Sequence, residues 1–330
     1  MVYSNLFDEI ISLENLFESW KEFRRGKRKK PDVQLFERYL EDNIFQLHSE
    51  LKNKIYRHSE YTSFYITDPK RRHIHKACVK DRIIHHAVYR VLYPIFDKNF
   101  IYDSYSCRLR KGTHNAVKRL ARFTRIVSKN YTNSCWVLKC DIKRFFASVD
   151  HEILFELIKK KIADRKVLWL VWEIISSFNS RERESKRGLP IGNLTSQIFA
   201  NVYLNELDGF IKHRLGVRFY LRYCDDFIIL DNDIPKLENY LGQIQFFLQC
   251  QLSLKLHPSK IIIRKLKQGI DFLGYVNFAD YRILRTKTKR RMLKRICVNN
   301  LPSYLGFLRH CNSYKLRQEV DYLTKNINFC

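Results

Sequence analysis

The stretch LRYCDDFIIL, residues 221–230, places two carboxylates side by side within an apolar run that is typical of a strand. Moving one carboxylate out of water is costly, and Asp225 and Asp226 also repel each other unless a positive group lies nearby. Aspartate suits tight turns as well, so the pair alone is weak evidence for a functional site. The pattern predicts a hairpin over 219–230, with its turn near Cys224 and Asp225.

A third carboxylate ends another apolar segment. The run WVLKCDI, residues 136–142, is rich in strand-forming residues and brings Asp141 to its end, just before Phe145 and Phe146. Ligands often gather at strand ends in proteins that mix helices and strands. A helix cap or a salt bridge would be the default interpretation of Asp141 if it stood alone. If this strand lies beside the hairpin, the three carboxylates converge.

Three converging carboxylates favour divalent cations. With two ions ~4 Å apart they form a site for phosphoryl transfer, and hard oxygen ligands favour Mg²⁺ or Mn²⁺ over zinc. One ion would activate the 3′-hydroxyl of a primer, and the other would neutralise the triphosphate of an incoming nucleotide. A nuclease could use the same ions, but it needs no triphosphate clamp of the kind that the basic residues 70–72 suggest.

The overall charge indicates a polyanionic partner. Lys and Arg number 61 against 34 Asp and Glu, a net charge of +27. Such a surplus favours nucleic acid, because contacts with phosphates release condensed counterions. A ribosome-associated or merely soluble basic protein is the alternative. The charges are spread along the chain, which argues against a membrane-surface helix.

Helical and strand-like segments alternate along the chain. Helical spacing is expected over 6–22, 32–55 and 81–97, and a hairpin with strands at 61–66 and 74–79 would carry Lys70, Arg71 and Arg72 at its tip. The basic run 24–31 is either a solvated loop or an arm that contacts phosphates. Pro and Gly are few, 7 and 10, which predicts subdomains that pack together rather than hang on linkers.

Nothing in the sequence predicts membrane insertion or export. No run approaches the ~20 apolar residues of a membrane span, and the first residues lack the order of a secretory signal. The nine cysteines are scattered, without a C-x-x-C pair, which favours reduced thiols over disulfides or a zinc site. We therefore expect a cytoplasmic protein.

These motifs together resemble those of reverse transcriptases. DIKRFF at 141–146, GLPIGNLTSQ at 188–197 and YCDD at 223–226 are similar to the first three palm motifs, and HPSKIIIRK and FLGY to the fourth motif and the primer grip. DPKRRHIH, KDRIIHHAVYRVLYPIFD and DSYSCRLRKGTHNAV resemble the fingers motifs of the bacterial enzymes. The resemblance runs from about residue 10 to 280.

The resemblance assigns roles to individual residues. Asp141 and Asp225 would bind the metals, supported by Asp226, and Ile142 joins them at the metal site. Lys260 would protonate the leaving pyrophosphate or is one more surface lysine. Phe146 would stack below the sugar and exclude a 2′-hydroxyl, or simply packs in the core. The expected residues of the nucleotide site are Lys70, Arg72, Ile142, Arg144, Phe145, Phe146, Ile191, Gly192, Gln197 and Lys260, and those of the primer grip are Leu273, Gly274 and Tyr275.

The second motif departs from the usual pattern. Most reverse transcriptases have Gln–Gly there and end the motif in Ser–Pro, whereas this chain has Ile191–Gly192 and Ser196–Gln197. That variant is similar to the enzymes of diversity-generating retroelements, which copy a template-repeat RNA and misincorporate opposite adenines. Ile cannot make the hydrogen bonds that Gln offers near the nascent base pair. The resemblance also implies a small, basic, oligomeric accessory variability protein as a partner.

The expected architecture is an α+β right-hand polymerase fold, with an antiparallel palm sheet and a short helical thumb. Two other functions stay open: a compact group II-like, retron-like or defence-associated reverse transcriptase, and a maturase-like RNA-binding scaffold with vestigial catalysis. The expected regions are an N-terminal helical and basic extension at 1–60, fingers at 61–135, a first palm segment at 136–151, fingers helices at 152–187, the palm at 188–279 and the thumb at 280–330.

Overall fold

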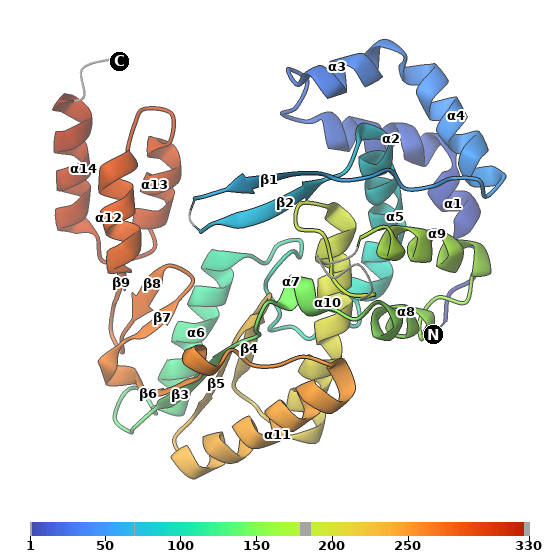
Figure 1. The fold of residues 1–330 in the computed structure, drawn as a ribbon. Coiled ribbons are helices and arrows are strands. Elements are labelled where there is room, and N and C mark those ends of the chain that lie inside the picture. The colour runs from blue at the N-terminus through green and yellow to red at the C-terminus, as the bar shows by residue number, and fades with distance from the viewer. Residues whose placement is uncertain (1, 69, 179–185, 327–330) are drawn as a thin grey trace. The chain divides into compact units, whose positions relative to one another are not determined.

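The computed structural model of the chain describes residues 2–68, 70–178 and 186–326 (Figure 1). The chain forms two compact units. Unit 1 comprises Met1–Tyr102, Ile142–Arg214 and Ile244–Lys255, and unit 2 comprises Asp103–Asp141, Leu215–Gln243 and Leu256–Cys330. Each unit is therefore built from segments that are distant in sequence. The boundaries expected for fingers, palm and thumb stay a prediction.

Unit 1 is mostly helical. Its long central helices, α5 and α10, pack against each other, and α10 is apolar on nearly every side because neighbouring helices surround it. The elements of unit 1 are α1 (Phe7–Ile11), α2 (Leu13–Arg24), α3 (Pro31–Arg38), α4 (Leu40–Lys52), β1 (Thr62–Ile66), β2 (Arg72–Lys76), α5 (Val79–Asp97), α7 (Phe145–Ser148), α8 (His151–Lys159), α9 (Arg165–Ser176), α10 (Leu194–Gly209) and the π-helical turn η1 (Phe210–Arg214).

Two expected helices are interrupted in unit 1. The segment 6–22 breaks at Ser12, whose backbone is extended and whose hydroxyl accepts the N–H of Asn15, so that Ser12 caps α2. The segment 32–55 breaks at Tyr39, whose φ of −119° and ψ of 40° are not helical. Apolar periodicity continues through both breaks, which is why spacing alone predicted continuous helices.

The strands β1 and β2 form the expected antiparallel hairpin. Its second strand is Arg72–Lys76 rather than 74–79, a correction that follows from Cys78, which already serves as the N-cap of α5. Arg72 is thus the first residue of β2 and Lys70 lies in the connecting turn, both exposed. Every residue of β1 is exposed to solvent as well.

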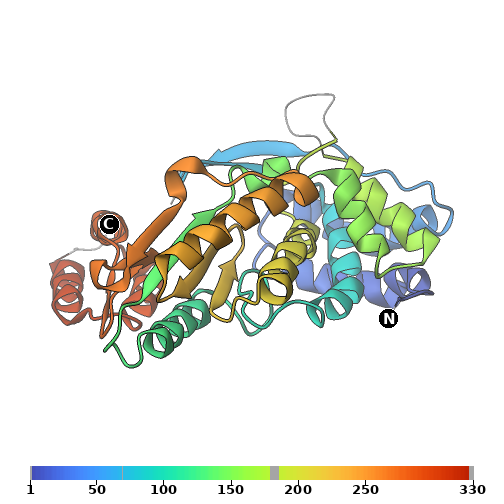
Figure 2. The ribbon, with the colours of Figure 1, turned by 90° about the horizontal axis from the view of Figure 1, so that it is seen from below.

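Unit 2 contains the antiparallel sheet that the sequence predicted. The strand order is β4-β5-β3-β6, with a separate sheet β7-β8-β9. Figure 2 shows α6 running beside the strands, where it contacts β4 and β5. The elements are α6 (Thr113–Val127), β3 (Trp136–Asp141), β4 (Tyr220–Tyr223), β5 (Asp226–Asp231), the 3₁₀ turns η2 (Pro258–Lys260) and η3 (Leu266–Gln268), β6 (Ile262–Lys265), β7 (Ile270–Phe272), β8 (Tyr275–Asn277), β9 (Arg282–Leu284), α12 (Thr286–Arg295), α13 (Leu301–Leu308) and α14 (Tyr314–Asn326); α11 (Ile234–Leu252) begins here and ends in unit 1.

An apolar core holds unit 2 together. It includes Val117 of α6, Ile228 of β5, Phe272 of β7, Met292 of α12 and Val320 of α14, all inaccessible to solvent. The three C-terminal helices therefore pack on the same core as the sheets. None of the helices in the described part of the chain is long and apolar enough to span a membrane.

Candidate active site

Strand pairing in unit 2 brings the acidic residues together. Asp141, the last residue of β3, lies directly opposite Asp226, the first residue of β5. Asp225 precedes Asp226 in the two-residue turn between β4 and β5, since Tyr223 pairs with Asp226. Directly opposed residues of an antiparallel pair have Cβ atoms about 4.5–5.5 Å apart. The pairing expected from the sequence is therefore confirmed, and it gathers three carboxylates at one end of the sheet.

The turn that carries Asp225 has an uncommon backbone. Cys224 has a φ of 55°, in the left-handed region that non-glycine residues seldom adopt. Arg222 stabilises this conformation: it is fully buried, and its guanidinium donates hydrogen bonds to the Cys224 carbonyl (3.2 Å) and the Ser104 hydroxyl (3.3 Å). Strained residues persist only where their surroundings fix them, and they cluster at functional sites. The turn is thus held in one conformation from beneath.

Burial and the neighbouring carboxylates destabilise the charged forms of Asp225 and Asp226. Burial and, next, the charge of Asp141 raise the pKa of Asp225 above its usual value. Burial also raises the pKa of Asp226 to about 6, and the charges of Asp141 and Asp225 add to this while Lys139 opposes it. Two partly buried acids with raised pKa values indicate a place where positive charge is missing.

A lysine ammonium is in direct contact with the cluster. The ammonium Nζ of Lys260 lies 2.7 Å from Oδ1 of Asp141. The position of Lys260 is set by η2, which begins at Pro258, and by the backbone N–H of His257, which donates to the Asp141 carbonyl at 2.8 Å. Lys260 therefore forms an ion pair with the acidic cluster, and its backbone position is fixed, unlike that of an ordinary surface lysine.

The donor set suits a hard cation that shares its ligands with a substrate. Among the described residues, no three His, Cys, Asp or Glu side chains are arranged as a ready-made metal cage. Mg²⁺ does not require one, because it usually binds through one or two carboxylates together with water and substrate phosphates. Asp141 and Asp225 fit that mode of binding, and the pKa of Asp225 is raised first by its burial and then by the charge of Asp141.

A basic hollow adjoins the carboxylates. It has a volume of about 180 Å³, and its walls include Lys139, Lys260, Arg264 and Arg285, with Asp271 as the acidic member. Lys139 donates to the backbone carbonyl of Asp271 at 2.8 Å, and Arg285 pairs with the Asp271 carboxylate. Four cations against one carboxylate leave this surface positive, as a site for phosphate groups requires.

A comparison with models of protein families identifies the family of this chain. The family model described as "Reverse transcriptase (RNA-dependent DNA polymerase)" matches residues 67–277, well over half of the chain. The chain belongs to the reverse transcriptase family. The matched range contains all three carboxylates, Lys260 and the second strand of the β1–β2 hairpin.

Two curated relatives are similar to this reverse transcriptase. Protein YkfC of Escherichia coli (strain K12) is 24% identical, and the match covers 60% of this chain and 60% of YkfC. The group II intron-encoded protein LtrA of Lactococcus lactis subsp. cremoris is 25% identical, over 77% of this chain and 52% of LtrA. The chain thus spans a little over half the length of these relatives.

Solved telomerases share the fold. The telomerase of Candida albicans, in complex with a fragment of telomeric RNA, superposes with a TM-score of 0.55 at 11% identity, over 74% of this chain and 51% of that one. The truncated apo telomerase of Candida tropicalis gives 0.51 at 13% identity, over 74% and 60%. At such identity the likeness shows the fold alone, and it supports the expected right-hand polymerase fold.

In unit 1 of the reverse transcriptase, the second motif docks on the hairpin. The carbonyl of Ile191 accepts the backbone N–H of His75 in β2 at 3.1 Å. Gly192 has a φ of 122°, and a Cβ there would lie 3.1 Å from Cγ2 of Ile74. Glycine is therefore needed at this position both for its backbone and for the close approach of β2.

The other expected nucleotide residues of unit 1 differ in accessibility. Phe145 is 1% exposed and packs against Phe146 and Tyr203, which is the behaviour of a core residue. Phe146 keeps part of its ring accessible, as Gln197 does its side chain. Ile142 is buried, so it can reach a metal or nucleotide only through its backbone. Arg144 is exposed and left-handed, with a φ of 49°.

The expected primer grip forms the turn between β7 and β8 in unit 2. Leu273 and Gly274 are its two central residues, with φ values of 51° and 89°, a hairpin turn that requires both to be left-handed. Tyr275 is fully buried, and its hydroxyl donates to the Phe307 carbonyl in α13 at 3.0 Å. The turn is thus anchored to the C-terminal helices, and Leu273 and Gly274 are half-buried, with Leu273 packed against the core of unit 2.

Sequence reasoning missed Arg222 and Lys139, which hold and partly neutralise the acidic turn. The sequence does contain a signal for Arg222, since a lone arginine in the apolar run YLRYC must find buried partners.

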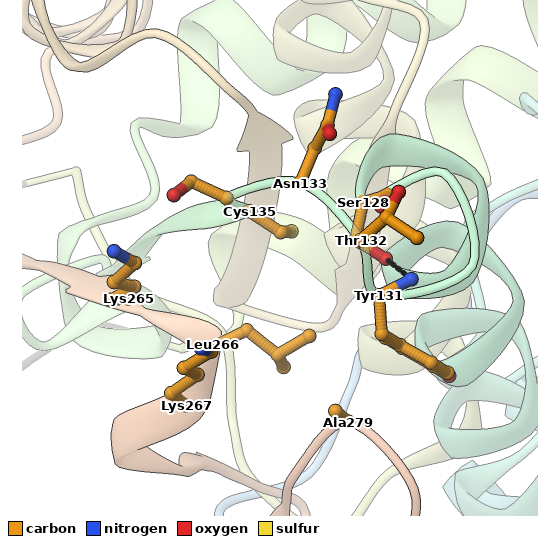
Figure 3. Close-up of a pocket in the computed structure, with 10 residues that line it drawn as sticks. Ser128, Tyr131, Thr132, Asn133, Cys135, Lys265, Leu266, Lys267 and Ala279 are labelled. Carbon is orange, nitrogen blue, oxygen red and sulfur yellow. Dashed lines mark hydrogen bonds between the residues drawn. The ribbon is translucent and has the colours of Figure 1, made fainter.

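A second, smaller hollow of about 80 Å³ lies at the other end of β3, between Ser128, Tyr131, Cys135 and Lys265 (Figure 3). The hollow lies at the start of β3 and Asp141 lies at its end, so the hollow is separate from the carboxylates.

Proposed function

We propose that this chain is an RNA-directed DNA polymerase that uses Asp141, Asp225 and Asp226 to hold two Mg²⁺ ions, with Mn²⁺ as a substitute. The observation that carries the proposal is the register of β3 on β5, which opposes Asp141 to Asp226 beside the fixed turn of Asp225. When bound, the ions supply charge neutralisation for the triphosphate and lower the pKa of the primer hydroxyl. Family membership supports RNA as template and dNTPs as substrates.

The chain's own cations would act on the phosphates. Lys260, whose ammonium lies 2.7 Å from Asp141, would give its proton to the leaving pyrophosphate after turning from the Asp141 carboxylate to the phosphates. Arg264 and Arg285, in the basic hollow next to Lys260, would bind backbone phosphates of the primer strand. Lys70 and Arg72, on the exposed hairpin, would hold the triphosphate.

Primer extension tests this function. The protein is incubated with an RNA template, an annealed DNA primer, dNTPs and Mg²⁺, beside Asp225→Ala and the matched control Asp231→Asn. Asp231 ends the same strand, β5, where it pairs with Lys236. We expect extension by the wild type and the control, and a loss of at least about 10³-fold with Asp225→Ala. Unimpaired RNA binding with no extension by the wild type would instead support an RNA-binding scaffold.

The finer proposal concerns accuracy. We infer from Ile191–Gly192 and Ser196–Gln197 that the enzyme copies a template-repeat RNA with errors at adenines, as enzymes of diversity-generating retroelements do, together with a basic oligomeric accessory protein. An aliphatic Ile191 offers no hydrogen bond that rewards a correct base pair, a loss of roughly 1–3 kcal/mol in discrimination.

Replacing the aliphatic side chain tests this inference. Ile191→Gln should lower misincorporation opposite template adenines by about 5- to 100-fold while errors at the other bases change less. Ile191→Leu, which keeps an aliphatic side chain at a partly exposed position, is the matched control. Sequencing of the cDNA provides the measurement, and an unchanged adenine error rate in Ile191→Gln would reject the finer proposal.

A further inference from the structure

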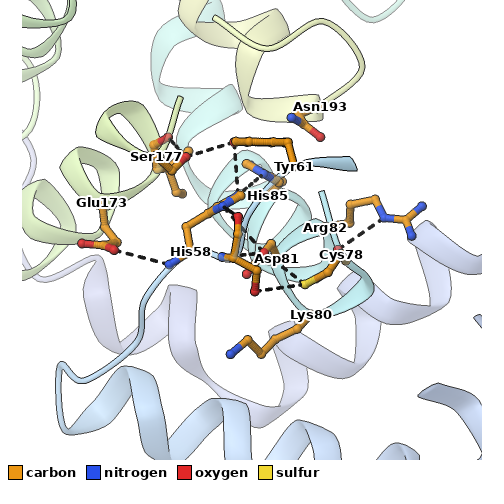
Figure 4. A network of polar contacts seen from close by, with 12 residues as sticks. His58, Tyr61, Cys78, Lys80, Asp81, Arg82, His85, Glu173, Ser177 and Asn193 are labelled. Carbon is orange, nitrogen blue, oxygen red and sulfur yellow. Dashed lines mark hydrogen bonds and ion pairs between the residues drawn. The ribbon is translucent and has the colours of Figure 1, made fainter. Parts of the chain in front are cut away.

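A buried polar network lies at the base of the β1–β2 hairpin in unit 1 (Figure 4). Asp81 and His85 are four residues apart on α5, so they share one face of the helix, and they are 0% and 1% exposed. The Asp81 carboxylate accepts hydrogen bonds from the Tyr56 hydroxyl at 2.7 Å and from the Ser59 N–H at 3.0 Å. The carboxylate thereby fixes the segment that leads into β1.

Two histidines connect this carboxylate to the second motif. Nδ1 of His58 lies 2.7 Å from the Ser59 carbonyl and 3.7 Å from Oδ2 of Asp81. Nε2 of His58 lies 3.2 Å from Nε2 of His85, and Nδ1 of His85 lies 2.7 Å from Oγ1 of Thr195. Only one of the two facing Nε2 atoms can carry a hydrogen, so the proton states of the rings are coupled. The result is a continuous hydrogen-bond network that runs from Asp81 through the backbone of Ser59 and the two imidazoles to Thr195.

Thr195 connects the hydrogen-bond network to the segment 191–197, which is expected to face the nucleotide. It is 1% exposed, in the first turn of α10, three residues after Gly192. The segment 191–193 is held separately on β2, through the Ile191 carbonyl and through the Asn193 amide, which donates to the His75 carbonyl at 3.5 Å. Segment 191–195 is therefore attached to the hairpin at two places: directly on β2, and through Thr195 and the histidines at the start of β1.

We propose that Thr195 and His85 are positioning residues that fix the segment 191–197 against the hairpin and so set the affinity for the incoming dNTP. The inference rests on the proposed polymerase function. Neither side chain touches the nucleotide in this role; their hydrogen bond holds the two surfaces expected to enclose it. Displacements of about 1 Å in such a frame are enough to weaken binding or rate by up to about 100-fold.

The test removes one hydroxyl at nearly constant volume. Thr195→Val leaves Nδ1 of His85 without its partner, whereas Thr195→Ser keeps the hydroxyl and serves as the rescue. Thr124→Val is the matched control, since Thr124 is equally buried in α6 of unit 2 and donates within its own helix to the Ala121 carbonyl at 2.8 Å. Single-nucleotide extension gives kcat and the KM for dNTP for each variant.

We expect Thr195→Val to raise the KM for dNTP by about 5- to 20-fold with kcat within about threefold, and Thr195→Ser to restore it. Partial unfolding would lower the active concentration and hence kcat, but not raise KM, so the split separates positioning from stability. An unchanged KM in an active Thr195→Val enzyme overturns the inference alone. Absence of extension by the wild type overturns the proposed function instead.

A second measurement is independent of activity. Hydrogen–deuterium exchange of the intact chain should be faster in Thr195→Val at both 62–76 and 191–195, and unchanged there in Thr124→Val. Faster exchange in only one of these segments would contradict the proposed coupling, because the network is the link between them.

Discussion

At the scale of single residues, the acidic cluster should destabilise the metal-free protein. The pKa of Asp226 is raised to about 6, first by burial, so its charge at neutral pH is unfavourable. We expect Asp226→Asn to raise the stability of the EDTA-treated protein by about 1–3 kcal/mol at pH 7.5, measured by urea unfolding. Asp231→Asn, which removes a partner of Lys236, should not stabilise it. A stability loss in Asp226→Asn would contradict the repulsion argument.

The same cluster should respond to Mg²⁺. Ions that bind only the folded state stabilise it by RT ln(1 + [L]/Kd), so the melting temperature rises with their affinity and concentration. We expect roughly 10 mM Mg²⁺ to stabilise the wild type and to have a much smaller effect on Asp225→Asn, in a thermal unfolding experiment. An equal shift in both proteins would place the ions elsewhere.

Lys260 makes a separate prediction at this scale. Its ammonium partly neutralises Asp141, and general-acid catalysis contributes typically about 10²–10⁴-fold. We expect Lys260→Met to lower kcat for nucleotide incorporation by about 10²-fold or more, with Lys260→Arg partly active. Lys255→Met, an exposed lysine five residues earlier, is the control. Normal kcat in Lys260→Met would leave the lysine as a structural partner of Asp141 only.

At the scale of elements, substitutions in the β7–β8 turn can test whether Gly274 is needed for backbone conformation alone or also for primer binding. A Cβ on Gly274 would meet nothing closer than 3.9 Å, so Gly274→Ala should cost only the strain of a left-handed alanine, roughly 1–2 kcal/mol. Gly269→Ala, where the Cβ would lie 2.7 Å from Val276 and 2.8 Å from Phe278, should cost more. Chemical unfolding checks both. If Gly274→Ala also abolishes extension, the missing Cβ serves the primer end.

Helix α5 should make stability depend on pH. Burial, and then the neighbouring His58, His86 and Arg82, hold the pKa of His85 well below 6.5. Below pH 6.5 the unfolded chain therefore binds a proton at His85 that the folded chain does not bind. The free energy of unfolding is unaffected by this group above pH 6.5 and decreases as the pH falls below it. The expected slope is near zero at pH 7.5 and approaches a limit of about 1.4 kcal/mol per pH unit below pH 6.5, and it is smaller in His85→Gln. Urea unfolding between pH 7.5 and 5.5 gives both slopes, and equal slopes would refute the assignment.

At the scale of the whole molecule, the charge of +27 should dominate nucleic-acid affinity. If the protein contacts roughly 6–10 phosphates, its affinity for a template–primer duplex should fall about 10³–10⁵-fold between 50 and 200 mM salt. Fluorescence anisotropy over this range measures the slope. Asp225→Asn should keep the same slope, because it removes no cation. A salt-independent affinity would exclude a phosphate-based grip.

Local elements were largely predictable from the sequence. The hairpin at 219–230 and the strand at 136–141 follow from apolar runs flanked by polar residues, and both are present as β4–β5 and β3. The breaks at Ser12 and Tyr39 were not predicted, because side-chain periodicity does not register a single capping or kinked residue.

By itself the sequence determined the chemistry: carboxylates in apolar runs of a basic chain, in the order of the reverse transcriptase motifs. Only the tertiary structure decided which groups meet. The register of β3 on β5 opposes Asp141 to Asp226, and an ion pair makes Lys260 part of the cluster. Phe145 is buried in the core, and the buried Arg222 stabilises the turn through its hydrogen bond to the Cys224 carbonyl. Partners separated by about a hundred residues are fixed by packing and pairing, which leave no local trace in the chain.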